Sequence, residues 1–233
     1  MIKDFNEFLV EGLYDPGIFK AFFLAGGPGS GKSFVTKSVF AGSGLKVVNS
    51  DAAFERSMKK ANLQLSMPPE EEYFRDLLRK RAKATAISQL ETYVEGKLGL
   101  VIDSTGRDYD SIARNHNRLK QLGYDCYMIF VNTNLKVALE RQKGRERQVP
   151  EYVVRKNWNG VQDNMGRFQR LFGMGNFIIV DNNKSQVELV TMTMNKINKI
   201  VRSLIKAPVR NYIAKQWIAK ERQARKRWDL KIL

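Results

Sequence analysis

A strand-like run that leads directly into a glycine-rich loop constrains this chain more than any other feature. The apolar run Ile18–Ala25 is followed at once by the pattern G-x-x-x-x-G-K-S over residues 26–33, and helical spacing begins at Phe34. A strand fixes such a loop at the carboxyl edge of a sheet, and its glycines let backbone N–H groups point inward at oxygen atoms. This order predicts a phosphate-binding loop; the alternative is a glycine-rich turn followed by Lys and Ser by chance.

The loop supplies the predicted nucleotide contacts. Lys32 provides a cation for the β- and γ-phosphates, and the Ser33 hydroxyl can ligate Mg²⁺, so ATP and Mg²⁺ are the predicted cofactors. The residues predicted to bind the nucleotide are Gly26, Gly27, Pro28, Gly29, Ser30, Gly31, Lys32, Ser33 and Phe34.

Two acidic residues follow predicted strands. Asp51 comes three residues after the strand Leu45–Val48, and Asp103 comes directly after the strand Leu98–Ile102. An acid at the carboxyl end of a strand projects toward the crevice where such sheets bind ligands. We therefore predict Asp51 to be a general base, although it could instead cap the next helix. Asp103 has the form of a Walker B acid, which holds the Mg²⁺ shell.

Arginines cluster beside a glycine between two predicted helices. Gly144-Arg145-Glu146-Arg147 follows the helix Leu135–Lys143 and precedes a helix whose apolar face begins at Tyr152. Such a segment suits a mobile lid that closes on transferring phosphates, and a solvated basic loop is the alternative.

Strands and helices alternate along the chain, which predicts an α/β fold with a parallel sheet of about five strands and helices on both faces. We predict an N-terminal amphipathic helix and turn (1–17), a main domain (18–206) and a basic helical extension (207–233). Ala207-Pro208 marks the last boundary.

The net charge of +16 is unevenly spread. From Lys196 to the end there are twelve Lys or Arg and two acids, which leaves +6 for the other 195 residues. This asymmetry predicts a polyanionic partner, nucleic acid and most simply DNA, for the extension. Its helix could instead lie on an acidic membrane or on the protein itself, and we expect Trp217 to be a packing residue.

One cysteine and one histidine exclude an internal disulfide and argue against a histidine metal site. We expect Cys126 to be a buried strand residue and His116 to lie on the surface. No run of residues is long enough for a membrane span, and we expect a reducing, cytoplasmic location.

Four segments, taken together, resemble the small kinases of the P-loop class: GGPGSGKS, VVNSD, LVIDSTGR and ERQKGRERQVPE, within residues 18–184. The nearest families are the zeta toxins and the kinase domain of polynucleotide kinases. The resemblance implies a three-layer P-loop kinase fold with Asp51 as general base. It also implies lid arginines at Arg145 and Arg147, with Arg141 as a third candidate. Residues 104–107 resemble the GTxR element of zeta toxins, but Asp103 stands where that family often carries Glu.

The opening residues FNEFL and the basic tail resemble proteins of large tailed phages, some of which phosphorylate hydroxymethyl-pyrimidines in DNA. The sequence therefore predicts a kinase that moves the γ-phosphate of ATP to a hydroxyl on nucleic acid, at a 5′ end or on a hydroxymethylated base. One alternative is a toxin-type kinase of a nucleotide-sugar or other small molecule. Another is a DNA-binding ATPase gated by nucleotide. A GTPase is disfavoured because no Asn-Lys-x-Asp occurs.

Overall fold

The computed structural model describes residues 12–65, 68–144, 149–183 and 186–232. Most of the predicted N-terminal helix and the two lid residues Arg145 and Arg147 lie outside these ranges, so those predictions stand as they were made. No helix in the described ranges is both long and apolar enough to cross a membrane.

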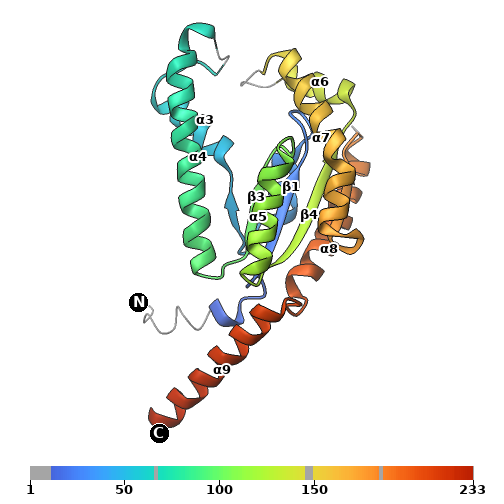
Figure 1. The fold of residues 1–233 in the computed structure, drawn as a ribbon. Helices are drawn as coiled ribbons and strands as arrows, with labels where there is room; N and C mark the ends of the chain where they lie inside the picture. Colours follow the sequence, from blue (N-terminus) through green and yellow to red (C-terminus); the bar gives the residue numbers. More distant parts are fainter. Residues whose placement is uncertain (1–11, 66–67, 145–148, 184–185, 233) are drawn as a thin grey trace.

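A five-stranded parallel sheet forms the centre of the molecule, in the order β2-β3-β1-β4-β5 (Figure 1). The central strand β1 is buried at every residue, because both of its neighbours and both of its faces are covered. This explains the unbroken apolar run before the glycine-rich loop. The strands are β1 (Lys20–Ala25), β2 (Lys46–Val48), β3 (Leu100–Asp103), β4 (Asp125–Asn132) and β5 (Phe177–Asp181).

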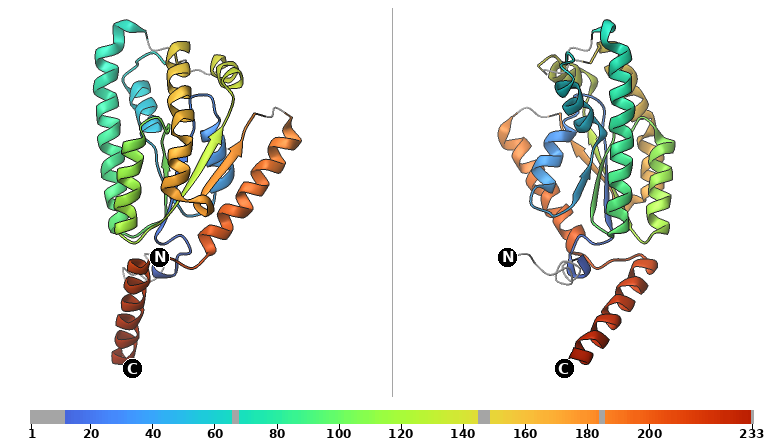
Figure 2. Two further views of the ribbon diagram at one scale, coloured as in Figure 1. Left: turned by 45° about the vertical axis from the view of Figure 1, so that its right-hand side comes forward. Right: turned by 90° about the vertical axis from the view of Figure 1, so that its left-hand side faces the viewer.

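Helices cover both faces of the sheet, which confirms the predicted α/β layers. One face carries α2 and α8, and the other carries α4, α5 and α7 (Figure 2). The helices are α2 (Lys32–Phe40), α3 (Ser50–Lys60), α4 (Glu72–Glu95), α5 (Tyr109–Gln121), α6 (Leu135–Lys143), α7 (Glu151–Phe172), α8 (Val187–Lys206) and α9 (Tyr212–Ile232), with short 3-10 turns η1 (Pro69–Glu71) and η2 (Met174–Asn176).

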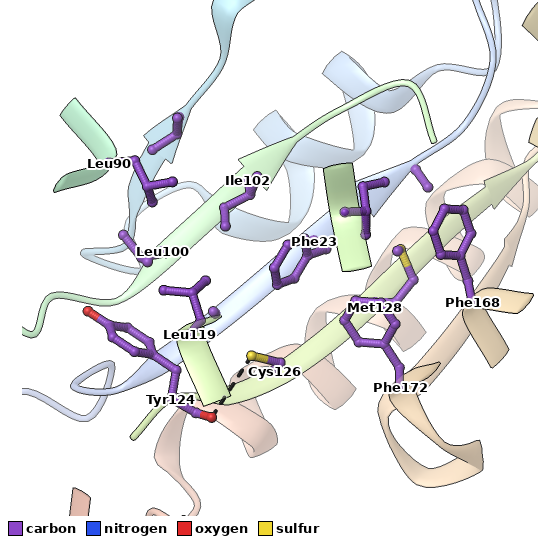
Figure 3. Close-up of a cluster of buried hydrophobic side chains, with 14 of the residues drawn as sticks. Phe23, Leu90, Leu100, Ile102, Leu119, Tyr124, Cys126, Met128, Phe168 and Phe172 are labelled. Atoms are coloured by element: carbon purple, nitrogen blue, oxygen red, sulfur yellow. Dashed lines mark hydrogen bonds between the residues drawn. The ribbon is translucent and has the colours of Figure 1, made fainter. Parts of the chain in front are cut away.

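Alternate side chains of β1 enter two separate cores. Ala21 and Phe23 point to the side of α5 and α7, whereas Phe22 and Leu24 point to the side of α2 and α8. Cys126 belongs to the first core and is buried beside Tyr124 (Figure 3), as predicted. Burial raises the pKa of its thiol to about 12, so this cysteine is an inert packing residue.

The expectation that His116 lies on the surface is wrong. Its side chain is only 3% exposed, and its ring meets the Phe172 ring edge-on at 4.6 Å. Ile112, His116 and Leu119 repeat at helical spacing and together form the buried face of α5. Burial lowers the pKa of the His116 imidazole, against an opposing hydrogen bond to Asn117, so the ring is a neutral core residue.

A buried carboxylate attaches the C-terminal segment to the sheet. Asp125, at the start of β4, accepts a hydrogen bond from Lys20 Nζ at 2.9 Å and from the backbone N–H groups of Arg210 and Asn211 at 2.9 and 3.0 Å. Lys20 and Asp125 are also paired residues of β1 and β4, so the strand register brings the two charges together. The segment that leads into α9 is therefore held at the edge where the strands begin.

The first turns of α9 pack on the core beside this anchor. Ala214 is fully buried, and Trp217 meets the Phe19 ring edge-on at 5.5 Å, which confirms the packing prediction for Trp217. Farther along, α9 projects away from the domain (Figure 1), and its basic residues Lys215, Lys220 and Arg222 are exposed. The extension therefore packs on the core through the first turns of α9 and presents basic side chains on its exposed surface.

Removing the anchoring carboxylate should strongly destabilise the fold. We expect Asp125→Ala to lower the free energy of unfolding by about 3–5 kcal/mol, because it leaves the Lys20 ammonium buried without its partner. Urea unfolding measures this loss through the transition midpoint.

Lys215→Ala on the exposed face of α9 is the matched control and should change stability by no more than about 0.5 kcal/mol. An Asp125→Ala protein that unfolds at the parental urea concentration would show that the anchor contributes nothing.

Candidate active site

A cavity of about 520 Å³ opens at the carboxyl end of the sheet, and most of the predicted site residues converge on it. Gly26, Ser30, Phe34 and Arg141 do not line it, although all four lie in or beside the loop region. The predicted residues that do line it are Gly27, Pro28, Gly29, Gly31, Lys32, Ser33, Asp51 and Asp103.

Two glycines of the loop are required by close packing as well as by backbone conformation. Gly29 and Gly31 have φ of +78° and +91°. A Cβ on Gly29 would lie 2.2 Å from the Ala138 carbonyl oxygen, and one on Gly31 would lie 2.3 Å from Asn182 Nδ2. Any other residue at these positions would push the loop away from α6 and from the end of β5.

The loop is also held by hydrogen bonds from the residues that directly follow β4 and β5. The Ser30 carbonyl accepts from Asn182 Nδ2 at 2.7 Å and from Thr133 Oγ1 at 3.1 Å. Arg141 donates to the Asn182 carbonyl at 2.9 Å, so it supports the loop from outside the cavity. The Ser30 hydroxyl is buried without a hydrogen-bond partner among the described residues.

Lys32, Asp103 and Asp51 interact electrostatically across the cavity. Lys32 Nζ donates to the Gly26 carbonyl at 2.5 Å. Burial raises the pKa of the Asp103 carboxyl; the Lys32 charge opposes that shift, and the Asp51 charge adds to it. Asn49 Nδ2 donates to Asp103 Oδ2 at 2.7 Å, so the half-buried carboxylate is also hydrogen-bonded.

Ser33 and Asp103 fit the predicted Mg²⁺ site in their chemistry. Both residues line the cavity and offer oxygen atoms, and partial burial of the Asp103 carboxylate favours a cationic partner. No group of three or more His, Cys, Asp or Glu that could hold a metal occurs in the part of the chain that the structure describes. A site with two protein oxygens suits Mg²⁺, which keeps several waters and also binds substrate phosphates.

Asp51 lies in the first turn of α3 but does not cap this helix. The N-cap of α3 is Asn49, whose Oδ1 accepts from the N–H groups of Asp51 and Ala52 at 2.8 and 3.1 Å. Asp51 is the second residue of α3, is exposed, and lines the cavity. The capping alternative is therefore wrong, and the position of Asp51 agrees with its predicted role in proton transfer.

The cavity wall opposite the loop comes from α3, α4 and α7. Glu55 lies one turn after Asp51, and Arg79 places its guanidinium 4.5 Å over the Phe54 ring. Asn157 lines the α7 side and accepts a hydrogen bond from Arg107 at 3.0 Å. This part of the wall offers charged and polar groups to the cavity.

The zeta-toxin-like segment 104–107 is fixed from α7. The Asn164 amide donates to the Gly106 and Arg107 carbonyls at 3.1 and 2.8 Å, and Asn164 itself is buried. Sequence reasoning missed Asn164 and Asn182 because each joins segments far apart in the chain. Asn49 could have been found, because an Asx residue just before an acid-bearing first turn is a common N-cap.

A glycine-rich loop between the central strand and α2, with an acid at the end of the neighbouring strand, is the arrangement of P-loop nucleotide-binding proteins. The sequence comparison is more specific. Residues 22–168 match the AAA domain family AAA_33, and the chain belongs to this family.

Relatives of known structure or class agree with the fold. Shikimate kinase of Persephonella marina is 25% identical over 175 residues, which are 75% of this chain and 97% of that protein. The structure of the PezAT toxin–antitoxin system of Streptococcus pneumoniae matches with a TM-score of 0.51 at 15% identity, covering 88% of this chain and 97% of that one. A Chloroflexus aurantiacus protein provisionally assigned as a kinase gives 0.52 at 15% identity, over 80% and 95%. The predicted kinship with P-loop small kinases is confirmed.

Changing the predicted base should affect chemistry and not stability. We expect Asp51→Asn to lower kcat for phosphoryl transfer by roughly 10²–10⁴-fold, because the amide cannot accept the acceptor's proton. Its melting temperature should match the parent, since Asn49 and not Asp51 caps α3. Turnover and thermal unfolding, measured on the same preparations, test both statements.

Glu55→Gln is the matched control, since Glu55 lines the same cavity one turn away, and it should lose less activity. An Asp51→Asn enzyme with parental turnover would exclude Asp51 as the base.

Lys32→Ala should abolish transfer with the fold intact, because Lys32 acts through its charge.

Proposed function

We propose that this protein is an ATP- and Mg²⁺-dependent phosphotransferase whose acceptor is a hydroxyl group. The observation that carries the proposal is the convergence of Lys32, Asp51 and Asp103 on one cavity beside the phosphate loop. These groups provide the cation, the base and the metal-shell acid that phosphoryl transfer requires.

Each side chain has a defined part in the reaction. Lys32 and the loop amides hold the β- and γ-phosphates, and Ser33 and Asp103 hold the metal. Bound Mg²⁺ would neutralise charge on the phosphate oxygens. Asp51 takes the proton of the acceptor hydroxyl while the hydroxyl oxygen forms a bond to the γ-phosphorus. The bond between the γ-phosphorus and the β–γ bridging oxygen breaks, which releases ADP. Arg145 and Arg147 would stabilise charge on the transferred group.

For the acceptor, we propose a hydroxyl on nucleic acid, at a 5′ end or on a hydroxymethylated base of DNA. The charge of +10 in the last 38 residues supports this class. The anchor of α9 lies at the strand starts and the cavity lies at the strand ends, so α9 and the reacting hydroxyl are at opposite ends of the sheet. In this proposal α9 retains the polymer on the enzyme and the cavity receives only the reacting nucleotide.

A small-molecule acceptor is the second candidate. The relative from Persephonella marina is a shikimate kinase, and the match covers 97% of that protein. A cavity of about 520 Å³ also falls within the usual range for small ligands, about 300–1,000 Å³. On this alternative the charge of α9 would serve a purpose other than substrate binding.

The destination of the γ-phosphate separates these candidates. We expect label from γ-labelled ATP to appear on an oligonucleotide with a free 5′ hydroxyl or on hydroxymethylated duplex DNA, and to be absent with Lys32→Ala. The same oligonucleotide carrying a 5′ phosphate is the matched control for end-phosphorylation. Label found only in a small-molecule fraction would select the second candidate. Label found only in free phosphate would indicate a nucleotide-gated ATPase and contradict the proposal.

The contribution of α9 can be measured separately through the salt dependence of DNA binding. Contacts between basic residues and phosphates release counterions, so affinity should fall steeply with salt. Replacing Lys215, Lys220, Arg222 and Lys226 by Gln should flatten the log–log slope by about 0.9 per lost contact on duplex, or about 0.7 on single strands. These four side chains are exposed, so the protein should keep its stability, unlike a truncation that removes the Asp125 contacts.

A protein with Lys60, Lys83, Lys136 and Lys199 replaced by Gln is the matched control, since it loses the same charge from exposed positions on other helices. Equal slopes for the two variants would exclude α9 as the specific contact.

A further inference from the structure

We propose that Asn49 is a positioning residue that orients the two carboxylates of the reaction centre, Asp51 and Asp103, relative to each other. The inference rests on the proposed function, because it assigns to Asn49 a role in the same phosphoryl transfer. Asn49 itself lines the cavity between the two acids.

The side chain of Asn49 uses both ends of its amide. Its Oδ1 accepts from the N–H groups of Asp51 and Ala52, and its Nδ2 donates to Asp103 Oδ2 at 2.7 Å. A flipped amide would place NH₂ against two N–H groups and oxygen against a carboxylate, so these contacts determine its orientation. One planar group therefore connects the start of α3 to the end of β3.

Strand register creates this arrangement. Val48 of β2 pairs with Ile102 of β3, so Asn49, just after β2, and Asp103, the last residue of β3, come next to each other at the same edge of the sheet. The chain then turns into α3, and Asp51 lies in the first turn of that helix. The direction of the Asp51 carboxylate therefore depends on how Asn49 sets the helix start.

Among the usual N-cap residues, asparagine has the chemistry that this position requires. Aspartate or serine would also cap α3, since Asn, Asp and Ser are nearly equivalent at an N-cap. Aspartate has no donor for Asp103 and would place a third negative charge beside two others. The shorter serine side chain carries no amide that could span both contacts. Substitutions of Asn49 can therefore separate its capping of α3 from its hydrogen bond to Asp103.

The test compares Asn49→Ser and Asn49→Asp for turnover, for the KM of ATP and for melting temperature. We expect both variants to lower kcat by roughly 10–100-fold, as small displacements of reacting groups do, with the larger loss for Asn49→Asp. The KM of ATP and the melting temperature should stay near parental values, because the phosphate loop and the cap are retained.

Asn134 provides the matched control. It caps α6 in the same way, through a hydrogen bond from Val137 N–H to its Oδ1, but it has no bond to either acid. Asn134→Ser and Asn134→Asp should therefore leave kcat unchanged.

Parental kcat in both Asn49 variants, or a fall in melting temperature with kcat retained, would overturn the inference and leave Asn49 as a cap alone. If Asn49→Ser does not fold, the kcat and melting temperature of Asn49→Asp decide between a positioning role and a capping role. These outcomes leave the proposed function intact, whereas a parent enzyme that transfers label to no acceptor would refute both.

Discussion

The register of the parallel strands is the constraint on which the candidate site depends. β1 pairs with β3 so that Leu24 lies opposite Asp103, and β2 pairs with β3 so that Val48 lies opposite Ile102. Parallel strands end at one edge, so the phosphate loop after β1, Asp103 at the end of β3 and Asn49 just after β2 all lie at the same edge of the sheet. Apolar packing on both faces of β1 fixes this register, because a slip of one residue would exchange the contents of the two cores.

The two ends of the sheet carry different charges for different physical reasons. At the strand ends, Asp51 and Asp103 stand near Lys32, and bound phosphates and metal would enter this balance. At the strand starts, Lys20 and Asp125 form a buried pair whose remaining hydrogen-bonding capacity is used by the chain entering α9. Burying that charged pair costs desolvation free energy. Its role is to fix the position at which the basic helix α9 leaves the domain. The charge excess of the C-terminal segment is thereby kept away from the reaction centre.

The sequence predicts those features whose cause is local. The glycine-rich loop, the acids after two strands and most element boundaries follow from short patterns, and the structure has them within a few residues. Asn182 and Ser30 are 152 positions apart, and no short pattern relates them. The surface prediction for His116 is wrong because its neighbours along the chain are polar, although it shares with Ile112 and Leu119 the face that α5 buries against the sheet. The sequence pattern leaves capping by Asp51 open as the alternative to its role as a base, because Asn and Asp are both good caps; the hydrogen bonds show that Asn49 is the cap.

Neutral amides hold the loops around this site, and electrostatics explains why. Asn49, Asn164 and Asn182 each join segments far apart in the chain through an NH₂ group. Asn49 donates to the Asp103 carboxylate at the end of β3, whereas Asn164 and Asn182 donate to the carbonyls of Gly106 and Ser30. A lysine or arginine in their place would add fixed charge beside the phosphates and compete with Lys32, and an aspartate or glutamate would repel them. An amide supplies a donor and an acceptor with no net charge, so it can orient loops and carboxylates without altering the charge balance that transfer requires. Rigid support and electrostatic neutrality are therefore met by the same residue type at three separate places.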